Sequence, residues 1–125
     1  MNQNRIQWVL RAEACAVLVA VVAMYAMRDP GWGRFFALFL VPDLALLGYL
    51  AGPRAGAIAY NATHSYVGPA VVAAIAISGA APAALPYALI WAAHCAFDRT
   101  LGYGLKYAAG FRHTHLGTIG RAAAA

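Results

Sequence analysis

Residues 6–27 read IQWVLRAEACAVLVAVVAMYAM, and this run decides the fold because it holds only two charges over 22 residues. A helix of about 20 apolar residues crosses a hydrocarbon core of roughly 30 Å. Arg11 and Glu13 interrupt the run early and no clear cleavage site follows it, so we take it as a first membrane helix rather than a signal peptide. The run ends at Arg28-Asp29-Pro30-Gly31, where a Pro-Gly pair predicts a turn.

Three more apolar segments follow, at residues 35–51, 55–77 and 82–97. Pro42 in the second and the Gly68-Pro69 pair in the third predict kinked helices. Residues 98–125 are glycine-rich and too polar to span, so we expect a cytoplasmic tail along the membrane interface. Short connections make consecutive helices antiparallel neighbours. The prediction is an all-α membrane protein, a single domain over residues 1–125 built as a four-transmembrane-helix antiparallel bundle.

The composition excludes a soluble globular protein and a nucleic-acid binder. Of the 125 residues, 63% are apolar and 10% are charged, and the mean hydropathy is +0.64, whereas soluble domains carry about 25% charged residues. The net charge of +5 comes from basic residues spread along the ends of apolar segments, without a basic run. The expected partner is therefore the lipid bilayer with its anionic headgroups, and no nucleic acid. Both a monomer and a homo-oligomer stay open.

The basic residues also predict the orientation. The N-terminal end, the second loop and the tail hold seven of the nine lysines and arginines, the first loop holds Arg28 and Arg34, and the third loop holds none. Because cytoplasmic loops are enriched in these residues, both ends of the chain are predicted to lie in the cytoplasm, in a multi-pass inner-membrane protein.

The polar residues within the helices are predicted to lie at one depth. At a rise of about 1.5 Å per residue, Asp43 and His64 lie about 12 and 13 Å from the cytoplasmic helix ends, and Asn61 about 9 Å. His94 lies one turn inside Asp98, and Glu13 lies a turn or two inside the first helix. Charged groups in a bilayer are costly and usually face the bundle interior. We therefore expect one shared polar cavity that opens toward the cytoplasm, while the outer halves stay apolar.

Spacing supports a common cavity, because His94 and Asp98 are four residues apart and Asn61 and His64 are three apart, so each pair shares a helix face. The candidate catalytic residues are Asp43, His64, His94, Asp98, Glu13 and Asn61. Each also has a structural alternative: Asn61 as an interhelical hydrogen-bonding residue, Glu13 as the partner of a snorkelling Arg11. Trp91 and Tyr87 either anchor the helices at the interface or line the cavity.

Carboxylate and imidazole ligands on facing helices suit Fe, Mn or Zn. The candidate metal ligands are His64, His94, Asp98 and Asp43, with His115 of the tail as a further one. Without a metal, the same groups can act as general acid and base. Arg54, Arg99 and Lys106 gather at the cytoplasmic face, where they can hold an anionic headgroup or merely reflect the positive-inside rule.

Five stretches resemble a family of small bacterial membrane proteins known as domain of unknown function 4260. They are PDLALLGYLAGPR (42–54), YNATH (60–64), WAAH (91–94), DRTLGYGLKY (98–107) and THLG (114–117). The family pattern has an aspartate before the last motif, where this chain has His113. The resemblance implies a bacterial membrane location and a helical fold but no activity.

Three hypotheses follow. The first is a membrane-embedded enzyme that acts on a lipid-soluble substrate with an anionic headgroup, with or without a metal. The second is a proton or metal-ion carrier subunit that uses the same groups as a relay. The third is a structural membrane partner whose polar cluster only fixes helix packing. The apolar outer halves favour the first, because a carrier needs polar groups on both sides.

Overall fold

The fold is helical in a computed structural model that describes residues 2–28, 31–105, 113–114 and 117–118. Its helices are α1 (Gln3–Ala26), α2 (Trp32–Phe39), α3 (Pro53–His64), α4 (Val67–Ile77) and α5 (Leu85–Leu101), with 3-10 segments η1 (Val41–Ala51) and η2 (Pro82–Ala84). Two short strands, β1 (His113–Thr114) and β2 (Gly117–Thr118), pair antiparallel in the tail. The helical prediction is confirmed, and the strand pair was not predicted.

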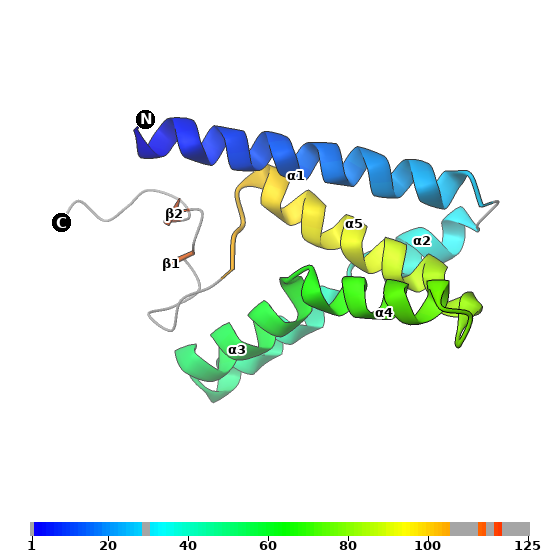
Figure 1. Cartoon of the computed structure of the whole chain (residues 1–125). Helices are drawn as coiled ribbons and strands as arrows, with labels where there is room; N and C mark the ends of the chain where they lie inside the picture. Colours follow the sequence, from blue (N-terminus) through cyan, green and yellow to red (C-terminus); the bar gives the residue numbers. More distant parts are fainter. Residues whose placement is uncertain (1, 29–30, 106–112, 115–116, 119–125) are drawn as a thin grey trace.

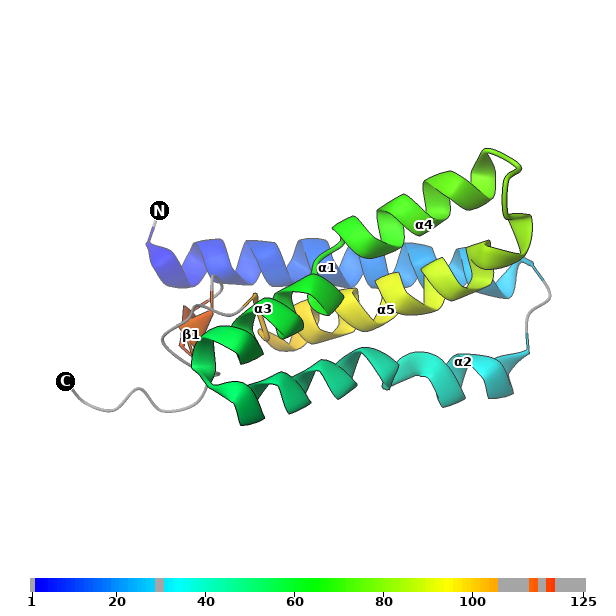
Figure 2. The ribbon, with the colours of Figure 1, turned by 90° about the horizontal axis from the view of Figure 1, so that it is seen from below.

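Consecutive long segments run in opposite directions (Figures 1 and 2). Helix α1 and the α3–α4 segment run one way, and the α2–η1 segment and α5 run back. Helix α5 is central, since α1, α2 and α4 all pack against it, whereas α3 packs on η1 as a separate hairpin. The chief apolar cluster accordingly joins α1, α2, α4 and α5; its buried members are Val21, Tyr25, Phe35, Ala76, Leu85, Leu89, Ile90 and Ala93.

Both predicted kinks are present, and both lie before the proline that causes them. Helix α2 ends at Phe39 and the chain continues as the 3-10 segment η1, with Pro42 at its start. The third segment breaks at Ser65, which is extended, rather than at the Gly68-Pro69 pair. Proline lacks the N–H that would bond the carbonyl four residues earlier, so Pro69 leaves the Ser65 carbonyl without a helical partner. Pro69 itself fits the first turn of α4, where that N–H is not needed.

The fourth helix is longer than predicted. We expected it to end at Phe97, but α5 continues through Asp98 and Arg99 to Leu101. The guanidinium Nε of Arg11 on α1 donates to the Thr100 carbonyl at 2.8 Å, which satisfies one of the last carbonyls of the helix. Gly102 then ends the helix with a φ of 96°, in the left-handed region. The two charged residues thus belong to the helix because tertiary contacts complete its last turn.

Two segments are long and apolar enough to cross a membrane, Gln3–Ala26 and Trp32–Ala51. Within the most apolar stretch of each segment, only 17% of the residues of the first and 6% of those of the second are buried. The core helix of a soluble protein would be mostly buried. Large apolar side chains are exposed along these segments instead, among them Val19 (63%), Phe36 (70%) and Leu50 (88%).

Candidate metal centre

Four of the predicted residues meet where the two broken segments face α5. Asp43 lies in the first turn of η1, directly after Pro42, and His64 is the last residue of α3. His94 and Asp98 come from successive turns of α5. Their ligand atoms all lie within 4.8 Å of one another. The structure thus brings these four predicted side chains together within metal-binding distance.

The donor atoms form a compact set. Asp43 Oδ1 lies 3.1 Å from His64 Nε2 and 3.2 Å from His94 Nε2. Asp98 Oδ2 lies 3.3 Å from each of the same two nitrogens, and the nitrogens are 3.1 Å apart. Neighbouring donors in a tetrahedral site with metal bonds of about 2.0–2.1 Å are separated by about 3.3–3.4 Å. Five of the six donor pairs therefore have nearly the spacing of tetrahedral ligands.

Hydrogen bonding defines which nitrogen of His64 is free to bind a metal. Its Nδ1 lies 2.9 Å from the Tyr60 carbonyl, which can only accept, so this nitrogen carries the proton. The neutral ring then turns the Nε2 lone pair toward two carboxylate oxygens and the nitrogen of His94. The Nε2 of His94 lies 3.1 Å away, so a proton on that nitrogen can be donated to His64 Nε2 or to a carboxylate oxygen. A divalent cation in place of that proton would be held by all four atoms and would balance the two carboxylates.

The site is buried around its nitrogens and more open at one carboxylate. The side chains of His64 and His94 are 3% and 1% exposed, that of Asp98 is 16% exposed and that of Asp43 is 37% exposed. Among the described residues, His94 Nδ1 makes no well-formed hydrogen bond, although the Phe39 backbone faces that ring. A ligand from outside would therefore reach the centre beside Asp43.

Tyr60 supports two of the candidate ligands, and sequence reasoning missed it. Its ring stacks on that of His64, with centroids 3.8 Å apart and an interplanar angle of 6°. Its hydroxyl lies 3.5 Å from Asp98 Oδ2. Groups of this kind orient ligands and tune metal affinity. The available signal was the four-residue spacing between Tyr60 and His64 in the YNATH motif.

The structure describes three of the other predicted site residues, Glu13, Asn61 and Arg54. Glu13 is exposed on α1, and Asn61 is part-buried on α3. Arg54 is exposed in the first turn of α3. Depth along a helix does not specify which face a residue occupies, so Glu13 can share the predicted depth and still lie at the surface. Lys106 and His115 lie outside the described residues.

Arg99 directly follows the candidate ligand Asp98 and is held against an aromatic ring. Its guanidinium carbon lies 4.3 Å from the ring centroid of Tyr66. Within the described part of the chain, its Nε is buried and has no hydrogen-bond partner. Of the two predicted headgroup residues that the structure describes, Arg99 is the one that directly follows a member of the cluster in the chain.

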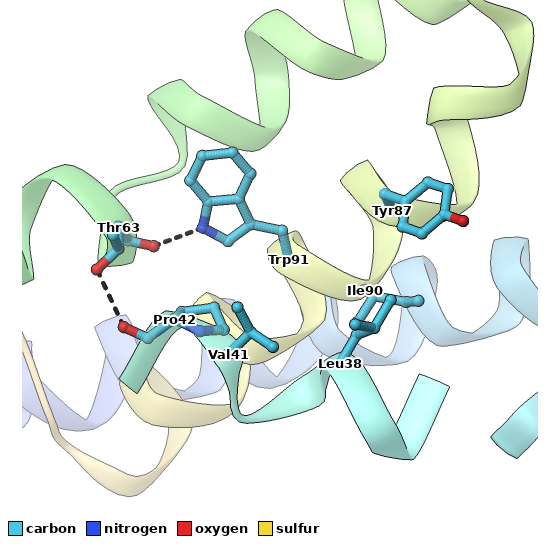
Figure 3. A pocket seen from close by; sticks show the side chains of 7 residues that line it. All are labelled: Leu38, Val41, Pro42, Thr63, Tyr87, Ile90 and Trp91. Carbon is cyan, nitrogen blue, oxygen red and sulfur yellow. Dashed lines mark hydrogen bonds between the residues drawn. The ribbon is translucent and has the colours of Figure 1, made fainter. Parts of the chain in front are cut away.

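A cavity of about 310 Å³ adjoins the four residues; it is lined by Leu38, Val41, Pro42, Thr63, Tyr87, Ile90 and Trp91. Figure 3 shows the indole of Trp91 facing Pro42 and Val41 across it. Trp91 and Tyr87 thus line a cavity, although it is not the polar one that was predicted. The expected polar cavity is corrected in one respect, because this space beside the polar cluster is apolar.

Comparison with known proteins gives one match. Residues 7–119 match the family described as Domain of unknown function (DUF4260). No curated protein and no solved structure matches the chain.

Proposed function

Because this chain belongs to that family of domains of unknown function, whose description names no activity, we propose from its four donor atoms that it is a membrane-embedded, metal-dependent enzyme. The observation that carries the proposal is the convergence of two imidazole nitrogens and two carboxylate oxygens, with five donor pairs 3.1–3.3 Å apart. Clusters of this composition suit Zn, Fe or Mn.

The proposed membrane arrangement has four spans with both ends in the cytoplasm of a bacterium. Besides α1 and the α2–η1 segment, the α3–α4 and η2–α5 segments cover residues 53–77 and 82–101. At about 1.5 Å per helical residue, each is close to the length of a span. The exposed apolar side chains support lipid contact on the outside, and the distribution of arginine and lysine supports the orientation.

The metal would be held by Nε2 of both histidines and by one oxygen of each aspartate. When bound, it would polarise a carbonyl or phosphoryl oxygen of a substrate or activate a water molecule. The chain itself supplies two negative charges that offset the ion, a buried pair of imidazoles, and an approach beside the half-exposed Asp43. Arg99 is placed to attract the anionic headgroup of a lipid-soluble substrate.

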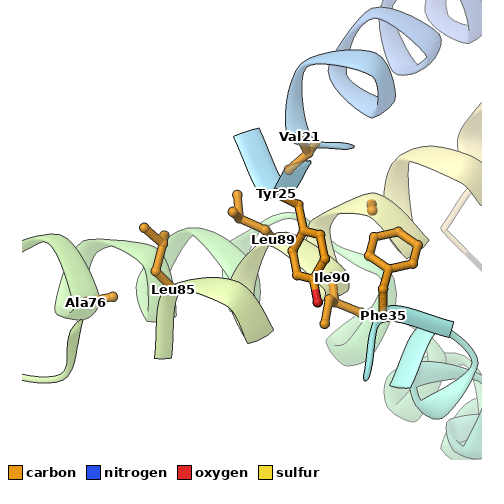
Figure 4. Packing of buried hydrophobic residues seen from close by; sticks show 8 residues of the cluster. Val21, Tyr25, Phe35, Ala76, Leu85, Leu89 and Ile90 are labelled. Atoms are coloured by element: carbon orange, nitrogen blue, oxygen red, sulfur yellow. The ribbon is translucent and has the colours of Figure 1, made fainter. Parts of the chain in front are cut away.

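The opposite end of the molecule supports an enzyme rather than a carrier. There the buried cluster around Tyr25, Phe35 and Leu89 fills the space between α1, α2 and α5 with apolar side chains (Figure 4). A relay or conduit requires polar groups through this region. The four donors therefore fit a site entered from one side.

Elemental analysis of the detergent-purified chain tests the metal centre. We expect about one equivalent of Zn, Fe or Mn per chain, retained through dialysis and lost in His64→Ala and His94→Ala. Glu13→Gln is the matched control, because it changes an exposed polar residue outside the cluster and should keep the metal. Wild-type protein that binds none of these metals, even after they are added and the excess removed, would overturn the proposal.

A further inference from the structure

The apolar cavity begins immediately beside the candidate ligands. Pro42 and Thr63 directly precede Asp43 and His64 in the chain, and both line the cavity. On α5, Tyr87, Trp91, His94 and Asp98 follow the spacing i, i+4, i+7 and i+11, so that cavity and cluster share one face of the helix. From Tyr87 to His94 the helix rises about 10 Å. The cavity thus extends away from the cluster toward the apolar end of the molecule.

The polar groups on the cavity wall are already used. The Nε1 of Trp91 donates to the Thr63 carbonyl, and the Thr63 hydroxyl lies 3.3 Å from the Pro42 carbonyl. At the far end, Tyr87 lies under the guanidinium of Arg34, whose carbon is 5.3 Å from the ring centroid. A polar ligand would find few free partners here, whereas a hydrocarbon chain needs none.

The cavity opens on an apolar surface. Val41 and Tyr87 on its wall are 47% and 49% exposed, and Leu40 and Leu44 beside it are each 63% exposed. In a membrane these side chains contact lipid, so a chain from the bilayer can enter sideways without crossing water.

We propose that this cavity binds one hydrocarbon chain of a membrane lipid, whose polar part then lies at the four-donor cluster. The proposal rests on the proposed function and deepens it, since it names the substrate class as an amphiphile with its chain toward Tyr87 and its polar end toward Asp98. The order of residues along α5 supports this direction, because the apolar wall, the ligands and Arg99 follow one another. The chain site and the metal centre are separate structures that can be tested separately.

Fluorescence of Trp91 reports occupancy of the cavity directly. With Trp8→Phe and Trp32→Phe, Trp91 is the only tryptophan left of the three. The purified protein in detergent micelles is titrated with a fatty acid brominated in mid-chain, because bromine quenches an indole in contact with it. We expect saturable quenching on top of the linear quenching caused by probe dissolved in the micelle.

Filling the cavity should abolish the saturable part. Val41→Phe places a larger side chain in the cavity wall, and Leu38→Phe does so from α2 if the first variant does not fold. Val71→Phe is the matched control, since Val71 is 53% exposed on α4 and outside the cavity. Saturation lost in the filling variants and kept in the control would support the chain site.

Metal content measured on the same samples separates the two proposals. Quenching that stays linear in metal-loaded protein, or that saturates equally in the filling variants, would overturn the chain site alone. Absence of metal would overturn the metal centre, whatever the quenching curve. The filling variants should keep their metal, because none of them changes a donor atom.

Discussion

Replacing Asp98 with asparagine removes one charge from the cluster and keeps the shape of the side chain. Its Oδ2 lies 3.3 Å from Nε2 of both histidines, and the side chain is 16% exposed. If these groups hold a metal, the substitution should lower the stability of the metal-loaded protein and raise that of the metal-free protein. That reversal of sign distinguishes a metal centre from a packing cluster.

The magnitudes follow from binding linkage. At a free metal concentration 100 times Kd, binding stabilises the folded protein by about 2.7 kcal/mol. Loss of an anionic ligand should weaken metal binding at least about 100-fold, because residues that only hydrogen-bond to a ligand already contribute about 10- to 100-fold to metal affinity. At the same free metal concentration, which then equals the Kd of the variant, binding stabilises the folded protein by only about 0.4 kcal/mol. Without metal, the asparagine amide can donate to an imidazole lone pair, and relief of an unsatisfied buried group is worth about 1–3 kcal/mol.

Thermal unfolding in detergent, with added Zn²⁺ and after chelation, measures both effects. We expect Asp98→Asn to unfold at a lower temperature than wild type with metal and at a higher temperature without it. Glu13→Gln removes an exposed charge from α1 and should change neither. If the cluster were a set of ion pairs with protonated histidines, Asp98→Asn would cost about 3–5 kcal/mol under both conditions. That result would refute the reasoning.

Three further substitutions test the surroundings of the site. Tyr60→Phe removes the hydroxyl that faces a candidate ligand, so the metal affinity measured by chelator competition should fall by about 10- to 100-fold while the fold is kept. Gly68→Ala places a methyl group against the Trp91 ring, which should cost about 1–3 kcal/mol in thermal unfolding and shift the Trp91 emission. Arg11→Ala removes the hydrogen bond to the Thr100 carbonyl, and we expect a loss of about 1.5–3 kcal/mol of stability with the metal content unchanged.

Each of these has its own control. Unchanged metal affinity in Tyr60→Phe would show that the tyrosine contributes only packing. A methyl group added at Gly33 in helix α2 meets no other atom within 4 Å, so Gly33→Ala should leave the stability unchanged or raise it slightly. Arg28→Ala, at an exposed arginine after α1, should leave stability unchanged. Equal losses in Arg28→Ala and Arg11→Ala would contradict the role given to the Thr100 contact.

The depth of each residue along its helix could be read from the sequence, and it correctly grouped Asp43 and His64 with His94 and Asp98 of α5. It did not distinguish Glu13, which has a similar predicted depth but is exposed on α1. Depth depends on residue count alone, because the helical rise is constant. Which residue faces a neighbour depends on how the helices rotate and pack, and that is set by contacts between distant segments.

The positions of the kinks show the same difference between what the sequence predicts and what contacts between distant segments decide. Pro42 and Pro69 predicted that the second and third segments would break, since each removes one helical hydrogen bond. The sequence did not predict that η1 and α3 would form a hairpin of their own, with α5 at the centre of the remaining helices. Nor did it predict that Arg11 would extend α5 past Phe97, a contact across 89 residues.

By itself, the apolar run of residues 6–27 with the later segments determined a helical chain whose surface suits lipid, because hydropathy and length are local properties. The sequence also determined which residues carry metal-binding chemistry. Only the tertiary structure decided that two nitrogens and two oxygens meet with five of their six pairs at nearly tetrahedral spacing, and that an apolar cavity opens beside them. Such spacing results from the joint placement of η1, α3 and α5, which no single segment encodes.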